Sequence, residues 1–438
     1  RCRDENGLAM NSTGLMARGE DLPASALTYG LVVALIIALQ FGPVIGLAGF
    51  LASGEAAWAL IGVSRDILVL GLLVLLGMRQ LGQPRPNRLL PSCRWALVMI
   101  ITFAMLSLAS ASSLTVMALN LRRLVLIPVL FVVILMTPWS RAQVMGLFSF
   151  VLSTSVLVAL LGFAERISPD RLWTEILRVE EFMAANVSDR FGRIGFYESG
   201  RFFSWDLERW LGTPLRRMVS TYMEPTTLAA GLAVALCAAL AKFARGERAG
   251  WLVLMFIVAL ILTLSKATFI FILVLIAWRA IGWPGPTSIV SLTLVATCIG
   301  FIAVQLGYSE GAFEHIDGLV EALQSLAGGH LLGSGIGSAG NYNDQGNELG
   351  GESGLGNAIA QAGLLGVLPL LWIRALSHDL AHAAYRRRDV GGPWLAMWLV
   401  FWVISFLFSA SSLGVGGNAL GFAMLALYLH PMWNGRAG

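Results

Sequence analysis

The stretch from Gly328 to Gly366 holds the residues best suited to chemistry, because it is polar, acidic and glycine-rich although apolar segments flank it. Its polar groups could not be satisfied inside lipid, so the stretch must lie in water or in a wet cavity. Within it, Glu352 offers a carboxylate that could deprotonate or orient a hydroxyl group. Ser353 follows directly, and His330 and the nearby His315 are further candidate bases, although a loop histidine is more often simply exposed or hydrogen-bonded.

The glycines of this stretch allow two interpretations. Glycine permits positive φ and close approach of the backbone, so N–H groups could surround an anion or a sugar. This interpretation predicts a mobile lid over a lipid-filled cavity. The alternative is a flexible loop in solvent without a function of its own.

A second set of chemically interesting residues consists of cations that we expect at the outer ends of membrane helices, where topology gives no reason for positive charge. The set comprises Arg122, Arg123, Arg216, Arg217 and Lys266. Such groups could bind the phosphate or diphosphate of a lipid, or each could reach the outer headgroups or pair with an acidic loop residue. Arg65 and Asp66, inside an apolar run, should face the bundle interior and pair with neighbouring helices.

The composition requires a membrane to position these residues. The chain has 57% apolar and 13% charged residues over 438 positions, and its mean hydropathy is +0.74, which is typical of a polytopic membrane protein. The net charge of +4 is expected from basic cytoplasmic loops, so no nucleic-acid partner is predicted. Cys2, Cys93, Cys237 and Cys298 show neither a disulfide framework nor the spacing of a metal site.

Apolar runs of roughly 17–25 residues are typical of membrane-spanning helices, and we expect about twelve of them. They cover 26–50, 56–78, 95–118, 122–138, 142–164, 223–244, 250–265, 267–283, 287–306, 357–376, 393–411 and 414–432. The expected fold is therefore all-α, with a single membrane domain over 26–438 that follows a polar cytoplasmic tail over 1–25.

The distribution of arginine and lysine predicts the orientation. If the N-terminus is cytoplasmic, then the basic loops 79–94, 242–249 and 374–392 are cytoplasmic too, and they alternate with loops that carry little charge. Both termini are then cytoplasmic. The two long excursions, 165–222 and 307–356, fall on the outer side, and loops of such length are usually functional.

The two excursions differ in character. Apolar residues at helical spacing within 171–185 predict an amphipathic helix that lies on the membrane surface. Segment 307–356 is an acidic, glycine-rich loop without lysine or arginine.

Two short motifs are not expected to be functional sites. Gly335 to Gly340 matches G-x-G-x-x-G, but no strand precedes it and no βαβ unit contains it, which argues against a dinucleotide site. Gly351 to Gly354 is similar to the G-x-S-G of intramembrane serine proteases. Such a serine needs a histidine partner on another helix, but His378, His382 and His430 are expected on the cytoplasmic side and could not reach Ser353.

Three further patterns occur in order between residues 215 and 370. The first, 217–229, reads RMVSTYMEPTTLA and leads into an apolar helix, with Pro225 suited to its first turn. The second, 262–267, reads LTLSKA, and the third is HLLGSGIG at 330–337, followed by Glu352-Ser353 and by QAGLLG at 361–366. Together they resemble the bacterial O-antigen ligase and O-antigen polymerase superfamily, polytopic glycosyltransferases that act on undecaprenyl-diphosphate-linked glycans.

The chain departs from the family pattern at two places. Lys266 stands where the family has arginine, and Glu352-Ser353 stands where its ligases carry His-Asn or His-Ser. The glutamate is more similar to the polymerase branch, so the resemblance favours a polymerase and leaves a ligase as the alternative.

The resemblance implies metal-independent, inverting glycan transfer without a cofactor, at the periplasmic face of the bacterial inner membrane. Glu352 would act as the base or orient the acceptor, and Arg217 and Lys266, with Arg216, Arg123 and Arg122, would bind the donor diphosphate. The supporting candidates are Ser353, Glu224, Tyr222, His330 and His315.

The implied partners are the undecaprenyl-diphosphate-linked donor, a glycan or lipid A-core acceptor, membrane lipids and a chain-length regulator protein. A function of another class, secondary transport, would also use many spans. Transport predicts two related halves with broken helices at midplane, and no half-to-half repeat is visible in the sequence.

Overall fold

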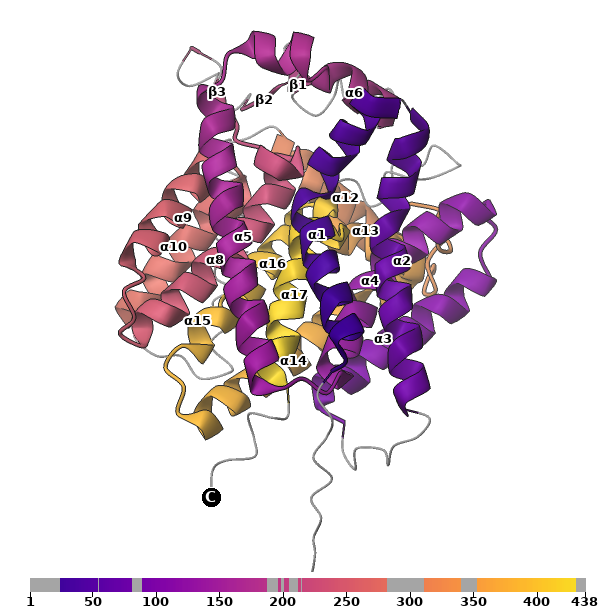
Figure 1. The fold of residues 1–438 in the computed structure, drawn as a ribbon. Helices are drawn as coiled ribbons and strands as arrows, with labels where there is room; N and C mark the ends of the chain where they lie inside the picture. Colours follow the sequence, from indigo (N-terminus) through magenta and orange to yellow (C-terminus); the bar gives the residue numbers. More distant parts are fainter. Residues whose placement is uncertain are drawn as a thin grey trace, which may run out of the picture.

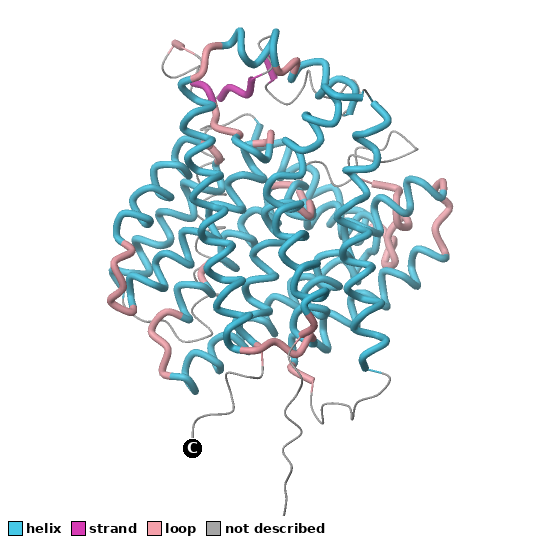
Figure 2. Tube along the Cα trace, viewed as in Figure 1, coloured by secondary structure: helices cyan, strands magenta, loops and turns pink. Residues whose placement is uncertain are grey.

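The apolar runs of the sequence form a bundle of helices that carries a small layer of short strands and helices at one end (Figure 1). The computed structural model describes residues 24–53, 55–80, 89–186, 196–197, 201–204, 212–213, 215–281, 311–339 and 353–430. Figure 2 shows that the strands lie at the end of the bundle opposite α14 and α15, and we call this end the sheet end.

The described residues of the first half of the chain form five long helices. They are α1 (Ala26–Ser53), α2 (Glu55–Gln80), α3 (Pro91–Leu108), α4 (Leu114–Met136) and α5 (Arg141–Ile167). Their ends follow local chemistry: Pro91 suits the first position of α3, and Ser140 and Gln143 form a capping box at the start of α5. Consecutive pairs pack together, with α1 against α2 and α3 against α4.

The second half completes the bundle with shorter and more broken helices. They are α8 (Pro225–Ala244), α9 (Gly250–Leu262), α10 (Lys266–Ile281), α12 (Gly311–Ala327), α13 (Gly354–Ala362), η4 (Gly363–Val367), α14 (Leu368–Arg387), α15 (Gly392–Ala396), α16 (Trp398–Phe408), η5 (Ala410–Leu413) and α17 (Gly416–Leu429). Helices α8, α16 and α17 are buried along most of their length, so they form the centre of the bundle.

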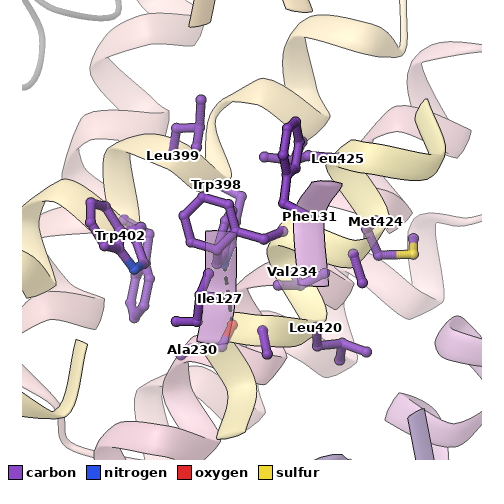
Figure 3. Close-up of a cluster of buried hydrophobic side chains, with 14 of the residues drawn as sticks. Ile127, Phe131, Ala230, Val234, Trp398, Leu399, Trp402, Leu420, Met424 and Leu425 are labelled. Atoms are coloured by element: carbon purple, nitrogen blue, oxygen red, sulfur yellow. Dashed lines mark hydrogen bonds between the residues drawn. The ribbon is translucent and has the colours of Figure 1, made fainter. Parts of the chain in front are cut away.

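The core lies where α4, α8, α16 and α17 meet (Figure 3). Aromatic rings of α16 interdigitate with small residues of its neighbours. The Trp398 ring lies against α8, where its indole N–H donates to the carbonyl of Ala230 at 3.4 Å. Phe422 of α17 meets Trp398 edge to face, with 5.0 Å between the ring centroids.

The layer at the sheet end folds from the segment between α5 and α8. Its described elements are η1 (Leu172–Ile176), α6 (Val179–Asn186), β1 (Phe196–Tyr197), β2 (Arg201–Ser204), β3 (Leu215–Arg216) and η3 (Ser220–Tyr222). The strands form an antiparallel sheet in the order β1-β2-β3, with Phe196 opposite Phe202 and Phe203 opposite Arg216.

The expectation of a mostly helical, membrane-embedded chain is confirmed. Among the described residues, six helices are long and apolar enough to cross a membrane, and Gly250–Leu262, Gly392–Phe408 and Gly416–Leu429 are shorter apolar helices. Every expected span overlaps a described helix, except 287–306, which lies outside the described residues, as does nearly all of the tail over 1–25.

One expected boundary is wrong. The apolar runs predicted helices over 95–118 and 122–138, but α3 ends at Leu108 and α4 begins at Leu114. Serines interrupt the helix here because their hydroxyls bond to backbone groups. The Ser110 hydroxyl donates to the carbonyl of Ile336 and accepts from the N–H of Ser112.

The first excursion differs from its expected form. The predicted helix over 171–185 is interrupted, because Arg178 has a φ of +47° between η1 and α6. Apolar side chains of both parts pack on the protein, where Trp173 and Phe182 form a small core with Leu47 of α1 and Phe202 of β2.

The second excursion contains a helix that was not predicted. Within 307–356, helix α12 occupies Gly311–Ala327 and contacts α13 and α16. Ala322 is fully buried while Val320 and Leu323 are exposed. The residues 340–352 of the same segment lie outside the described residues.

At the end opposite the sheet, an ion pair joins the loops that follow α8 and α14. The Arg245 guanidinium donates two hydrogen bonds to the Asp389 carboxylate, from Nε at 3.0 Å and from Nη2 at 2.9 Å. The N–H of Gly391 donates to the same carboxylate at 2.9 Å. Burial raises the pKa of Asp389, but the hydrogen bonds from Arg245 and Gly391 outweigh it, so the pKa lies below its ordinary value.

We predict that Asp389→Asn lowers the free energy of unfolding by about 1–2 kcal/mol, because the charge-assisted pair is lost. A carboxyl group with a lowered folded-state pKa stabilises the fold above its unfolded pKa of about 3.9. This contribution disappears as the pH falls through the folded-state value. Thermal unfolding in detergent between neutral and acidic pH measures both effects.

The matched control is Glu175→Gln, which breaks the surface pair of Glu175 with Arg171, whose side chains are 60% and 81% exposed. That change should alter the melting temperature little, because exposed pairs contribute little. Equal losses in the two variants would contradict the assigned role of Asp389.

Candidate functional site

Two segments that the sequence places far apart meet at the sheet end. The backbone that leaves β3 runs beside the turn between α9 and α10, where the N–H of Met218 donates to the carbonyl of Leu262 at 2.9 Å. The Nε of Arg217 donates to the carbonyl of Thr263 at 3.0 Å. Helix α10 begins at Lys266, three positions further along the chain. Arg217 and the turn that leads into Lys266 therefore form one unit.

The backbone of this unit is strained. Ser220, Met223 and Leu264 have φ values of +48°, +53° and +50°, in the left-handed region that favours glycine. Each such residue is unfavourable by about 1–3 kcal/mol, and residues of this kind cluster at functional sites. The Ser220 hydroxyl holds its segment in place by donating to the carbonyl of Val158 at 2.6 Å.

Lys266 adds an electrostatic feature to the turn. It is exposed and is the first residue of α10, where the positive end of the helix dipole disfavours a cation. The cationic side chain and the α10 N-terminus therefore reinforce each other, and an anion near this turn would be attracted by both.

Glu224 and Tyr222 occupy different environments at the start of α8. Glu224 is half-buried in the N-cap position, and its carboxylate accepts hydrogen bonds from the hydroxyls of Thr226 and Thr227. The Tyr222 ring is buried, and its hydroxyl lies so close to Gly231 that a Cβ there would be 2.5 Å away. Glu224 thus remains partly accessible, whereas Tyr222 supports packing.

Arg216 belongs to a buried ion cluster rather than to the turn of Arg217. Its guanidinium donates to the backbone carbonyl and the carboxylate of Glu165 at the end of α5. Arg201 of β2, with 1% of its side chain exposed, reaches the same carboxylate at 3.1 Å and Asp170 at 2.8 Å. The cluster fastens the sheet to α5, so Arg216 has a structural role whatever else it contacts.

The other two candidate cations lie inside a helix. Because α4 begins at Leu114, Arg122 and Arg123 are about 12 Å along it from its start, and the expectation that they lie at a helix end is wrong. Arg122 pairs with Asp66 of α2, with 2.7 Å between Nε and Oδ2. This pairing confirms that Asp66 faces a neighbouring helix, and Arg123 follows on the same stretch of α4.

The glycine-rich loop after α12 is packed against the bundle. The N–H groups of Ser334 and Gly335 donate to the carbonyls of Ala360 and Gln361 at 2.9 and 3.0 Å, and the N–H of Gly337 donates to Oε1 of Gln361 at 2.9 Å. Ile336 is fully buried. The expectation of a mobile lid is therefore wrong for 333–339, because this backbone is bound to the end of α13.

The glycines of the loop are needed for this close packing. Gly363 has a φ of +61°, and a Cβ built on it would be 2.0 Å from the carbonyl oxygen of Leu331. Both the backbone conformation and the lack of space exclude a side chain. The loop and the break between α13 and η4 therefore depend on each other.

We predict that Gly363→Ala destabilises the protein by about 2–5 kcal/mol, through strain in the left-handed region and overpacking. The melting temperature in detergent measures the loss. Gly246→Ala is the matched control, because Gly246 has a φ of +82° but open space within 4 Å of the point that a Cβ would occupy. A control as damaging as Gly363→Ala would show that packing against Leu331 is unimportant.

Ser353 begins α13 as its N-cap. Its hydroxyl accepts from the N–H of Gly356 at 3.0 Å and donates to the carbonyl of Leu407 in α16 at 2.7 Å. The side chain is fully buried, so Ser353 fixes the start of α13. Glu352, the residue before it, lies outside the described residues.

The histidine candidates are not joined to the turn of Arg217 by any described contact. His330 is exposed between α12 and the packed loop. His315 falls in α12, and its side chain lies outside the described part of the molecule. Within the described ranges, no group of three or more His, Cys, Asp or Glu side chains is placed to hold a metal ion.

Helix α16 connects the parts of the candidate site. Helix α8 begins directly after Glu224, α10 begins at Lys266, and α13 begins directly after Ser353. All three helices contact α16.

Comparison of the chain with protein-family models and with curated protein sequences finds no match in either.

Two residues of this region were not predicted from the sequence. Arg201 is fully buried in the ion cluster, although its neighbours in the chain indicated an exposed excursion. Gln361 links α13 to the glycine-rich loop through both its carbonyl and its side chain. The glutamine within an apolar helix was the available signal, since a buried amide must find partners.

Proposed function

We propose that the chain is a membrane glycosyltransferase that transfers or polymerises glycan from an undecaprenyl-diphosphate donor at the periplasmic face of the inner membrane. The observation that carries this proposal is the contact of Arg217 with the turn that leads into Lys266, at 3.0 Å from Nε to the Thr263 carbonyl. It joins two of the three motifs on which the family resemblance rests. About twelve spans with both termini in the cytoplasm belong to the same proposal.

The proposed reaction uses groups of opposite character on the two sides of the reacting sugar. The acceptor hydroxyl oxygen attacks the anomeric carbon while the bond from that carbon to the diphosphate oxygen breaks, which inverts the configuration. Glu352 takes the hydroxyl proton or orients the hydroxyl group. The bonding electrons leave with the diphosphate, whose charge Arg217 and Lys266 stabilise.

Two of the other candidate cations have a different role in this proposal. Arg216 and Arg122 already have carboxylate partners in Glu165 and Asp66, so in this proposal they support the fold around the site. Glu224, half-buried at the start of α8, is the supporting carboxylate nearest in sequence to Arg217.

The direct test is a liposome assay with the purified protein and a radiolabelled, undecaprenyl-diphosphate-linked oligosaccharide. Longer lipid-linked products would support polymerisation, and transfer to a lipid A-core acceptor would support the ligase alternative. Neither product, together with uptake of a solute, would overturn the proposal in favour of transport.

A further inference from the structure

A cavity of about 250 Å³ lies at the opposite end of the bundle from the proposed glycan site, between α3 and α14. It is lined by Pro91, Trp95, Leu371, Arg374, Ala375 and His378. The lining therefore combines a guanidinium group, an imidazole and an indole, and it includes no carboxylate.

The start of α3 is fixed next to this cavity. The N–H of Ser92 donates to Oδ2 of Asp379 at 2.8 Å, so a carboxylate of α14 caps α3. Oδ1 of Asp379 lies 3.8 Å from Nδ1 of His378. Asp379 is thus bound by the α3 backbone, and Arg374 is the cation among the residues that line the cavity. Within the described part of the chain, no hydrogen bond or ion pair joins Arg374 to another residue.

An exposed apolar stripe leads away from the cavity along α3. Trp95, Val98, Ile101, Met105 and Leu108 are all exposed and follow each other at helical spacing. From Trp95 to Leu108 the stripe is about 20 Å long, which is comparable to one leaflet of the hydrocarbon core, about 15 Å thick. The cavity lies at the end of this stripe where α3 begins.

The arrangement matches the shape and charge of one phospholipid. A tryptophan at the end of an apolar face is typical of the level of the headgroups, and a basic recess between helices at this level can bind an anionic headgroup. The planar guanidinium of Arg374 is suited to two phosphate oxygens.

We propose that this cavity binds an anionic phospholipid, with the headgroup phosphate on Arg374 and His378 and the acyl chains along the exposed stripe of α3. The site is independent of the proposed glycan transfer, because it lies on other helices at the other end of the bundle. Bound lipid would hold α3 and α14 together beside the Ser92–Asp379 hydrogen bond.

The test uses purified, delipidated full-length protein in detergent, titrated with phosphatidylglycerol and followed by native mass spectrometry and thermal unfolding. Phosphatidylglycerol should bind and raise the melting temperature, and phosphatidylcholine should do neither. Arg374→Ala should weaken phosphatidylglycerol binding about tenfold, equivalent to about 1.4 kcal/mol. Arg374→Gln, which retains more of the side chain, should show the same loss.

Arg279→Ala is the matched control, because Arg279 is an exposed arginine in the last turn of α10 and does not line the cavity. Its phosphatidylglycerol affinity should equal that of the unmodified protein. Equal losses in Arg279→Ala and Arg374→Ala would overturn the proposal by showing a general effect of charge. Equal binding of phosphatidylcholine, or equal stabilisation by millimolar inorganic phosphate without lipid, would overturn it as well.

Discussion

Replacement of Glu352 by glutamine is expected to lower the rate of glycan transfer by about 100- to 10,000-fold, the usual contribution of a general base. Glutamine retains the size and the hydrogen-bonding capacity of glutamate but cannot take the proton of the acceptor hydroxyl. Expression and melting temperature should not change. The measurement is the initial rate of product formation from the radiolabelled lipid-linked donor in liposomes.

Two controls separate the proposed base from its surroundings. Glu348→Gln removes a carboxylate from the same acidic stretch and should leave the rate unchanged. Ser353→Ala removes the cap of α13, which is held by the hydrogen bond with Gly356 at 3.0 Å, and should reduce stability by about 1 kcal/mol. Full activity of Glu352→Gln would show that Glu352 neither takes the proton nor orients the acceptor.

Each expected span within the described residues overlaps a helix, because apolar length alone requires one there, whereas the amphipathic helix α12 was not predicted. The interruptions between helices could not be predicted, because they depend on individual hydrogen bonds and close backbone contacts that hydropathy does not report. The Ser110 hydroxyl bonds to the Ile336 carbonyl and ends α3 early. Gly363 ends α13 because its positive φ allows the glycine-rich loop to approach. Both interruptions depend on a segment that is distant in the chain.

Which residues carry the charges could be predicted, but which charges pair could not. The expectation that Asp66 finds a partner on a neighbouring helix is confirmed by Arg122. The ion cluster of Glu165, Arg201 and Arg216 was not foreseen, because its members are brought together only when the sheet folds onto α5. Sequence spacing gives no information about such contacts, so the sequence predicted the same role, binding of the donor diphosphate, for Arg216 and Arg217.

The structure separates these two neighbouring arginines by the alternation of a strand. Successive side chains of an extended backbone point in opposite directions. Arg216 turns to Glu165, while Arg217 turns to the carbonyl of Thr263. The contact with Thr263 places Arg217 beside the turn that leads into Lys266, and for this reason we propose these two cations for the donor diphosphate.

Lys266→Ala is expected to reduce kcat/KM for the lipid-linked donor by about 100-fold or more, because a positioned positive group that stabilises a departing anion typically contributes this much. Lys266→Arg should recover most of the activity, since it keeps the charge at the start of α10. The kinetics of product formation at varied donor concentration, measured in liposomes, show whether binding or transfer has been lost.

Arg171→Ala is the charge-matched control, because the Arg171 side chain is 81% exposed in the layer at the sheet end and pairs only with the exposed Glu175 among the described residues. A general effect of positive charge on an anionic donor would weaken both variants and would disappear at high salt. A specific diphosphate contact predicts a loss in Lys266→Ala alone, with rescue by arginine. An unchanged kcat/KM in Lys266→Ala would show that Lys266 and the turn between α9 and α10 do not contribute to the donor site.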